Sequence, residues 1–168
     1  MIDIRVLTPA DAEPFWNLRL RALKEHPRAF LASYEENEHL QPAEVAHRLD
    51  RTDSNVVIGA FTPESGLIGI VGLVREQRQK TRHRATIWGM YVAPDSQSGG
   101  IGAQLLARAI EEGRTMEGLS IIELSVILPN PPAQRLYDKM GFAVYGLHPR
   151  ALRVDGLDYD EELRSLEL

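Results

Sequence analysis

Cysteine is absent from the 168-residue sequence. Disulfide bonds, thiolate metal sites and a cysteine nucleophile are therefore excluded, and the absence fits a reducing compartment. The chain also lacks any run of about 20 apolar residues, the length that a membrane-spanning helix needs. Its first residues include Asp3 and Arg5 and lead into no long apolar segment, so we expect no signal peptide. These absences predict a soluble, cytoplasmic protein with no membrane contact.

Basic residues are fewer than acidic ones, since 19 lysines and arginines against 24 aspartates and glutamates give a formal net charge of −5. Because phosphate contacts supply most of the affinity for nucleic acids, we expect no nucleic-acid partner. The five histidines show no metal-ligand spacing, so we expect no metal site. Apolar residues make up 43% of the chain, which is enough for the core of a single domain over residues 1–168.

Hydrophobic spacing predicts helices in the first fifty residues. Thr8 and Pro9 suit a helix start, and Phe15, Leu18 and Ala22 follow on one helical face. Two shorter helices are expected, one within residues 29–38 and one that begins near residue 41.

The remaining chain alternates between strand and helix patterns. Strands are predicted over residues 56–61, 67–74, 85–92, 119–127 and 142–146, helices over 102–112 and 130–141, and a hairpin over 152–159. The first three strands are joined by short loops and form an antiparallel meander. The strand–helix–strand unit over residues 88–127 brings its two strands parallel. The expected fold is therefore α/β with a mixed sheet.

A glycine-rich loop between a predicted strand and a predicted helix carries the clearest chemistry. It reads Gln97-Ser98-Gly99-Gly100-Ile101-Gly102-Ala103. Glycines let the backbone approach a ligand closely, and the helix start adds free N–H groups and the positive end of its dipole, so the loop suits a phosphate. The third glycine of a dinucleotide fingerprint and the lysine of a P-loop are both missing. Taken alone, the loop is equally compatible with a plain turn.

A second motif follows one predicted strand later. Residues 130–142 read Asn-Pro-Pro-Ala-Gln-Arg-Leu-Tyr-Asp-Lys-Met-Gly-Phe. Together with the spacing Gln97-x-x-Gly100-x-Gly102, this motif resembles the two signatures of the GCN5-related N-acetyltransferases (GNATs). The resemblance covers residues 85–146 closely. It implies a central twisted sheet of about six to seven strands, mostly antiparallel with one parallel strand–helix–strand unit, and helices on both faces.

The resemblance implies an N-acetyltransferase that uses acetyl-CoA as co-substrate and transfers the acetyl group directly to a primary amine. It assigns acetyl-CoA binding to Met90, Tyr91, Val92, Gln97, Ser98, Gly99, Gly100, Ile101, Gly102, Ala103, Asn130, Ala133 and Tyr137. Tyr137 also matches the family's catalytic tyrosine, which protonates the leaving thiolate. By spacing alone, Tyr137 shares a helical face with Ala133 and Met140 and belongs to the core. Many relatives have an arginine in the loop, whereas this loop carries no charge, so backbone N–H groups would hold the phosphates.

The general base stays open among six side chains: Glu35, Glu36, Glu76, His83, Glu123 and Asp160. The acceptor is expected to be a small-molecule or peptide amine that the early helices and the final hairpin recognise. Acidic residues in these segments favour a cationic amine, namely Glu35, Glu36, Asp158 and Asp160.

A basic stretch over residues 75–84 has two interpretations, a solvated hairpin end or a site for an acidic partner or the distal phosphate of the co-substrate. Two other functions fit the same motifs: an acyl-CoA-binding module without turnover, and a transferase of a different acyl group. The sequence leaves a homodimer open.

Overall fold

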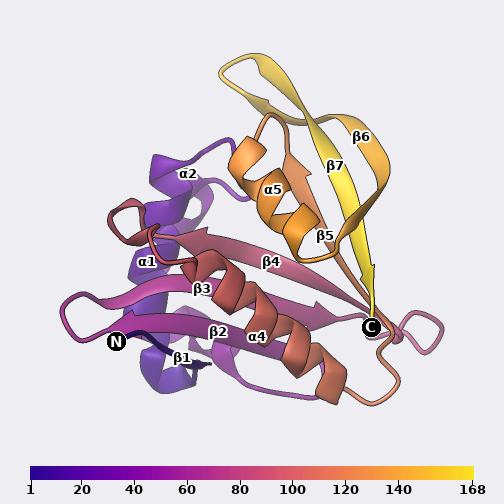
Figure 1. Ribbon diagram of the computed structural model, residues 1–168. Coiled ribbons are helices and arrows are strands. Elements are labelled where there is room, and N and C mark those ends of the chain that lie inside the picture. The colour runs from indigo at the N-terminus through magenta and orange to yellow at the C-terminus, as the bar shows by residue number, and fades with distance from the viewer.

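The computed structural model describes residues 1–168 and contains one seven-stranded sheet in the order β1-β2-β3-β4-β5-β7-β6 (Figure 1). The strands are β1 (Asp3–Val6), β2 (Asn55–Thr62), β3 (Gly66–Arg75), β4 (Arg84–Val92), β5 (Ile121–Ile127), β6 (Ala143–Val154) and β7 (Leu157–Glu167). Neighbouring strands are antiparallel except β4 and β5, which run parallel, as strands joined by a helical crossover do. The predicted mixed sheet is confirmed.

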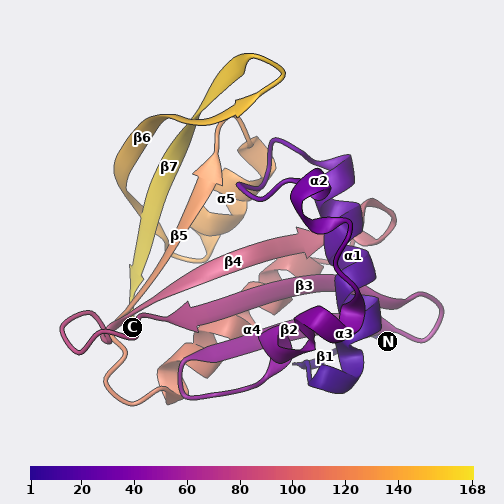
Figure 2. The ribbon, with the colours of Figure 1, turned by 180° about the vertical axis from the view of Figure 1, so that it is seen from behind.

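Helices cover both faces of the sheet (Figures 1 and 2). They are α1 (Ala12–Glu25), α2 (Tyr34–Asn37), α3 (Pro42–Val45), α4 (Ile101–Thr115) and α5 (Pro131–Lys139). The first three lie on one face, and α4 and α5 lie on the other. Where the sequence predicts the first helix start, a short 3-10 turn comes first, closed by Thr8 N–H donating to Asp11 Oδ2 at 2.8 Å. None of these helices is both long and apolar enough to cross a membrane.

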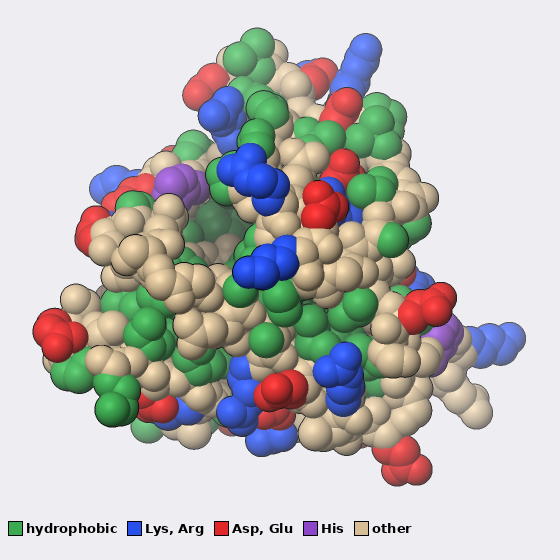
Figure 3. Space-filling model, viewed as in Figure 1, with side chains coloured by type: hydrophobic (Ala, Val, Ile, Leu, Met, Phe, Trp, Pro, Cys, Tyr) green, Lys and Arg blue, Asp and Glu red, His purple; other side chains and the backbone are tan.

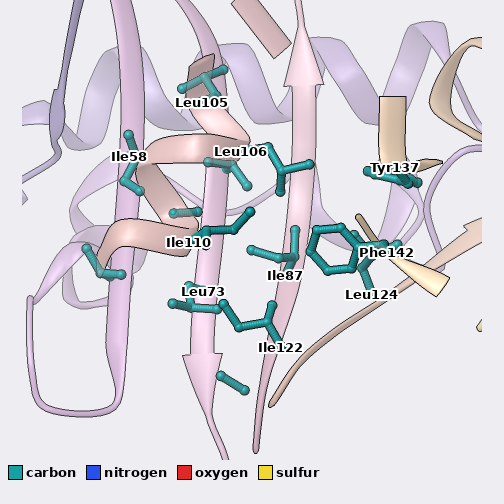
Figure 4. Close-up of a cluster of buried hydrophobic side chains, with 14 of the residues drawn as sticks. Ile58, Leu73, Ile87, Leu105, Leu106, Ile110, Ile122, Leu124, Tyr137 and Phe142 are labelled. Atoms are coloured by element: carbon teal, nitrogen blue, oxygen red, sulfur yellow. The ribbon is translucent and has the colours of Figure 1, made fainter. Parts of the chain in front are cut away.

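Side-chain alternation along the strands divides the core between the two faces of the sheet. On β2, Val56, Ile58 and Ala60 join the cluster on the α4 side, whereas Val57 joins the cluster on the α1 side. Figure 4 shows part of the first cluster, including Ile58, Leu73, Ile87, Leu105, Leu106, Ile110, Ile122, Leu124, Tyr137 and Phe142. Both faces of the central strands are buried, so these strands read as continuous apolar runs in the sequence.

The parallel strands β4 and β5 separate soon after they begin. Their ladder contains only three pairs, which join residues 84–86 to residues 121–123. Further along, β4 shifts its register against β3 between Ile70 and Gly72, close to Gly89, whose φ is +64°. A bulge of this kind bends the strand. The two strands diverge toward their carboxyl ends (Figures 1 and 2), so the β5-facing edge of β4 has no strand partner there.

Both ends of the chain differ from the sequence-based expectation. The edge strand β1 was not predicted, because four residues are too short for a clear pattern. The separate strand over 142–146 and hairpin over 152–159 form one long hairpin of β6 and β7, with positive φ at Asp155 and Gly156 in its turn. Pro149 lies within one of two register shifts of β6, which let the strand continue past a residue without an N–H group.

Candidate active site

A cleft of about 550 Å³ lies where β4 and β5 diverge. Its walls come from the end of β4, the glycine loop, the first turn of α4, the end of β5 and the inner face of α5, with His26 and Phe30 from the segment after α1. On the face shown in Figure 3, a hollow with hydrophobic side chains is visible between the α1–α2 segment and α5. The cleft thus joins the two motifs that the sequence analysis singled out.

The glycine loop presents its backbone to open space. Gly99 and Gly100 have φ values of +82° and +70°, and a Cβ atom added at either position would meet no other atom within 4 Å. Gly100 is the N-cap of α4, so the first N–H groups of this helix have no partner within the helix. The side chain of Gln97 donates to the carbonyl of Val92 at 3.2 Å and ties the loop to the end of β4. This geometry suits an anion such as a phosphate.

Helix α5 places Tyr137 on the cleft wall. The helix begins at Asn130, whose Oδ1 accepts a hydrogen bond from Ala133 N–H at 3.3 Å, a side-chain N-cap. Tyr137 is buried, its ring meets Phe142 edge-on at 6.2 Å, and its hydroxyl has no hydrogen-bond partner in the protein. Burial raises the pKa of Tyr137 to about 12, against a smaller opposing effect of the Arg164 charge. The phenol therefore keeps its proton at neutral pH.

A second cavity of about 400 Å³ adjoins the cleft. Six residues line both spaces: Ala29, Phe30, Met90, Ser125, Ile127 and Tyr137. The remaining wall of the second cavity comes from α1, the segment after it, β4, β5 and β7, and includes Arg19, Trp88 and Glu161. Glu161 is the only carboxylate in this wall, and Ser125 Oγ donates to its Oε1 at 2.5 Å. Tyr137 thus stands where two cavities meet.

The family model described as the acetyltransferase (GNAT) family matches residues 12–142, which is more than half of the sequence. The chain belongs to the GNAT acetyltransferase family. The matched range contains both motifs that line the cleft, namely the glycine loop and residues 130–142. It ends at the start of the β6–β7 hairpin.

Two curated relatives show what this GNAT chain is similar to. A mycothiol acetyltransferase from Brachybacterium faecium is 31% identical over 138 residues, which cover 81% of the chain and 39% of the relative. A spermidine N(1)-acetyltransferase from Vibrio cholerae is 28% identical over 117 residues, which cover 70% of the chain and 65% of the relative. The chain therefore spans less than two thirds of the length of either relative.

Solved structures share the fold over the full chain. A GNAT-family acetyltransferase from Streptococcus pneumoniae superposes with a TM-score of 0.91 at 24% identity and is covered completely. A putative acetyltransferase from Salmonella typhimurium, solved with its cofactor acetyl-CoA, superposes with a TM-score of 0.86 at 20% identity, with 94% of its chain covered. The fold is that of the GNAT acetyltransferases.

The structure brings together most of the residues that the GNAT resemblance assigns to acetyl-CoA. Eleven of the thirteen line the cleft: Met90, Tyr91, Val92, Gln97, Gly100, Ile101, Gly102, Ala103, Asn130, Ala133 and Tyr137. Ser98 and Gly99 belong to the same loop but are not part of the cleft wall. Close packing favours a glycine at position 102, because a Cβ atom at Gly102 would lie 3.3 Å from Met90 Cε.

None of the six general-base candidates lines either cavity: Glu35, Glu36, Glu76, His83, Glu123 and Asp160. Glu123 pairs with Arg84 at 2.5 Å, and Asp160 accepts from the backbone N–H of Arg150 at 2.9 Å. The acid that does line the second cavity, Glu161, is the neighbour of Asp160, and adjacent strand residues point to opposite faces. This alternation could have identified Glu161 only if a strand had been predicted through this segment.

Arg19 is a second wall residue that the sequence reasoning missed. It follows Phe15 by four residues, so it lies on the apolar face of α1, and an arginine on such a face was the available signal.

Basic side chains of the stretch over residues 75–84 form hydrogen bonds and ion pairs within the protein. Arg75 donates to the carbonyls of Arg82 and Glu117 at 2.5 and 2.7 Å, and Arg82 pairs with Asp53 at 3.0 Å. Arg78 and Lys80 are exposed. These contacts fasten the β3–β4 turn to its surroundings. No three metal-ligating side chains lie close enough together to hold a metal ion.

Proposed function

We propose that the protein is an acetyl-CoA-dependent N-acetyltransferase that binds acetyl-CoA and a primary amine at the same time. The observation that carries the proposal is the meeting of two cavities at Tyr137. One cavity has a backbone suited to phosphate, and the other has mixed polar and apolar walls suited to a small acceptor. A direct transfer needs both ligands at one point, and this junction provides it.

The cleft fits CoA through features of this chain. The open backbone around Gly100 at the start of α4 can receive the pyrophosphate without a charged side chain. The unpaired edge of β4 offers backbone N–H and carbonyl groups to the amides of the pantetheine arm. The residues proposed to bind acetyl-CoA are Met90, Tyr91, Val92, Gln97, Ser98, Gly99, Gly100, Ile101, Gly102, Ala103, Asn130, Ala133 and Tyr137.

Acetyl-CoA supplies a thioester whose carbonyl carbon the amine nitrogen attacks, so that an N–C bond forms, the C–S bond breaks and the sulfur leaves as a thiolate. Tyr137 is the proposed proton donor to that thiolate. Tyr137 lines both cavities, and its hydroxyl has no partner in the protein and keeps its proton at neutral pH because burial raises its pKa. Backbone N–H groups on the open edge of β4 stabilise the developing oxyanion.

The names of the relatives support acetyl transfer, since one is a mycothiol acetyltransferase and another a spermidine N(1)-acetyltransferase. The proposed acceptor is accordingly an amine of a small molecule or peptide.

A CoA-release assay tests the proposal. Purified protein is incubated with acetyl-CoA and a panel of primary amines, and free CoA is detected with a thiol reagent. Because the protein has no cysteine, the reagent reports released CoA alone. We expect release that depends on an amine, with the acetylated amine confirmed by mass spectrometry. Acetyl-CoA binding without release would instead identify a binding module, and faster reaction with a longer acyl-CoA would identify a different acyl group.

A further inference from the structure

Arg19 is a half-buried cation without an ionic partner. Its Nη1 atom is shielded from solvent and has no hydrogen-bond partner, and no carboxylate compensates its charge. The guanidinium lies over the rings of Phe30, at 4.9 Å, and Trp88, at 5.9 Å. Burial and the charge of Arg48 lower the pKa of Arg19 to about 10, so the side chain is still charged at neutral pH.

Eight other arginines of this chain have acidic partners within 3 Å, so the isolation of Arg19 does not come from a shortage of acids. Arginines paired within 3 Å are Arg5, Arg21, Arg51, Arg82, Arg84, Arg108, Arg153 and Arg164. A desolvated and unpaired guanidinium is unfavourable for folding unless an anion completes its coordination. In an arginine that lines a cavity, a ligand can supply that anion.

The position of Arg19 places that anion close to the reaction centre. Arg19 lines the second cavity, and its Nη1 lies 3.6 Å from where a Cβ of Gly89 would stand. Gly89 directly precedes Met90, which lines both cavities. A guanidinium presents a planar pair of N–H donors that match a carboxylate, so a carboxylate is the anion that this site favours.

The same cavity carries one opposite charge on a different strand. Glu161 is buried, its Oε1 is held by Ser125 at 2.5 Å, and its Oε2 lies 3.5 Å from His148 Nδ1. A buried carboxylate here can bind an ammonium group and take its proton. The acids that favoured a purely cationic acceptor lie outside both cavities: Glu35, Glu36, Asp158 and Asp160.

We propose that the acceptor is a small amine that carries a carboxylate, of the α-amino acid type, with its carboxylate on Arg19 and its amino group toward Glu161 and Tyr137. This inference rests on the proposed acetyltransferase function. Phe30, Leu31 and Ile87 supply an apolar wall for the rest of the acceptor. The amino group loses its proton to Glu161 and then attacks the thioester.

Matched acceptors and variants test the inference. The eighteen common amino acids other than cysteine, whose thiol would react with the reagent, and proline, which has no primary amine, are compared with their carboxamides in the CoA-release assay and by thermal shift of the CoA-loaded protein. We expect turnover and stabilisation with at least one amino acid, and kcat/KM lower by about 10- to 100-fold for its amide, as for loss of a charged hydrogen bond.

Arg19→Met keeps the apolar contact with Phe30 and Trp88 and should remove this preference. Its melting temperature should not fall, since a half-buried charge without an ionic partner is removed. Lys24→Met removes an exposed charge from the same helix and should keep the preference.

Two results would contradict the inference and leave the proposed function intact. In the first, amides react as well as amino acids. In the second, no amino acid stabilises the CoA-loaded protein more than its amide does. A third result would contradict both the inference and the acetyl donor: succinyl-CoA reacts in place of acetyl-CoA and only its use depends on Arg19, which would place the carboxylate on the acyl group. Failure of acetyl-CoA to bind at all would instead reject the proposed function.

Discussion

Gly100 has nearly the same φ as a glycine outside the cleft, and this allows a controlled test of the loop. Gly100 and Gly66 have φ values of +70° and +69°, and neither would place a Cβ atom within 4 Å of another atom. We expect Gly100→Glu to raise the acetyl-CoA dissociation constant at least about 100-fold, because its carboxylate repels the phosphates at the start of α4. Isothermal titration calorimetry measures this change.

Gly66→Glu is the matched control for Gly100→Glu, since Gly66 is the first residue of β3, directly after the β2–β3 turn, and does not line the cleft. Both variants introduce the same strained φ, which costs about 1 kcal/mol of folding stability. Equal loss of stability with unchanged affinity in both proteins would mean that the glycine loop is only a turn.

Tyr137→Phe separates a catalytic hydroxyl from a structural one. The hydroxyl has no partner in the protein and the ring keeps its contact with Phe142, so the melting temperature and the acetyl-CoA dissociation constant should change little. A positioned acid contributes typically about 10² to 10⁴ in rate, and a CoA thiolate is already a fair leaving group. We therefore expect kcat to fall at least about tenfold, near the low end of that range. Unchanged kcat, or a loss of stability together with kcat, would reject this role for Tyr137.

At the level of residues, local spacing predicted burial but not the partners of buried groups. The shared helical face of Ala133, Tyr137 and Met140 indicated a buried tyrosine, which the structure shows. Arg19 and Glu161 are 142 positions apart in the sequence, yet both line the second cavity beside the point where β4 and β5 diverge. A single sequence contains no local pattern for such a meeting.

At the level of elements, strongly periodic or fully apolar segments were predictable, and segments stabilised by distant contacts were not. The strands β2, β3 and β4 and the helix α4 bury apolar residues at regular spacing, and their positions were predicted closely. In β7, acidic and basic residues interrupt the apolar pattern, yet the segment is a strand because it pairs with β5 over residues 161–167 and with β6 on its other side. Tertiary pairing overrides the local pattern there.

One charged residue of β7 fastens α5 to the sheet. Arg164 has a side chain only 4% exposed and donates to Asp138 at 2.6 Å, to Glu162 at 2.7 Å and to the carbonyl of Phe142 at 3.4 Å. We expect Arg164→Ala to lower the free energy of unfolding by about 3 kcal/mol, because a buried set of partners loses its cation. Urea denaturation measures the change.

Asp138→Ala is the comparison for Arg164→Ala. Its side chain is 68% exposed, so its loss should cost no more than about 1 kcal/mol. A loss of equal size in the two variants would show that the exposed pair, rather than the buried arginine, holds α5 in place.

At the level of the whole molecule, the cleft separates two parts of one sheet. The strands β1 to β4 form one part and β5 to β7 the other, and only three residue pairs connect them as a ladder. A shared apolar cluster of 18 buried residues, which includes Ile110, Ile122 and Tyr137, completes the connection. A ligand in the cleft touches β4 and α4 on one side and β5 and α5 on the other, so its binding links the two parts directly.

Acetyl-CoA should therefore stabilise the whole fold. A ligand present at a hundredfold excess over its dissociation constant adds roughly 2.7 kcal/mol to the free energy of unfolding. For a chain of this size, that corresponds to a rise in melting temperature of about 5 to 11 °C, which differential scanning calorimetry measures. NADH at the same concentration should give a smaller rise, because the loop lacks the dinucleotide fingerprint. Gly100→Glu should abolish the rise with acetyl-CoA, whereas Gly66→Glu should keep it. No rise with acetyl-CoA, or a larger rise with NADH, would show that the cleft between β4 and β5 is not a CoA site.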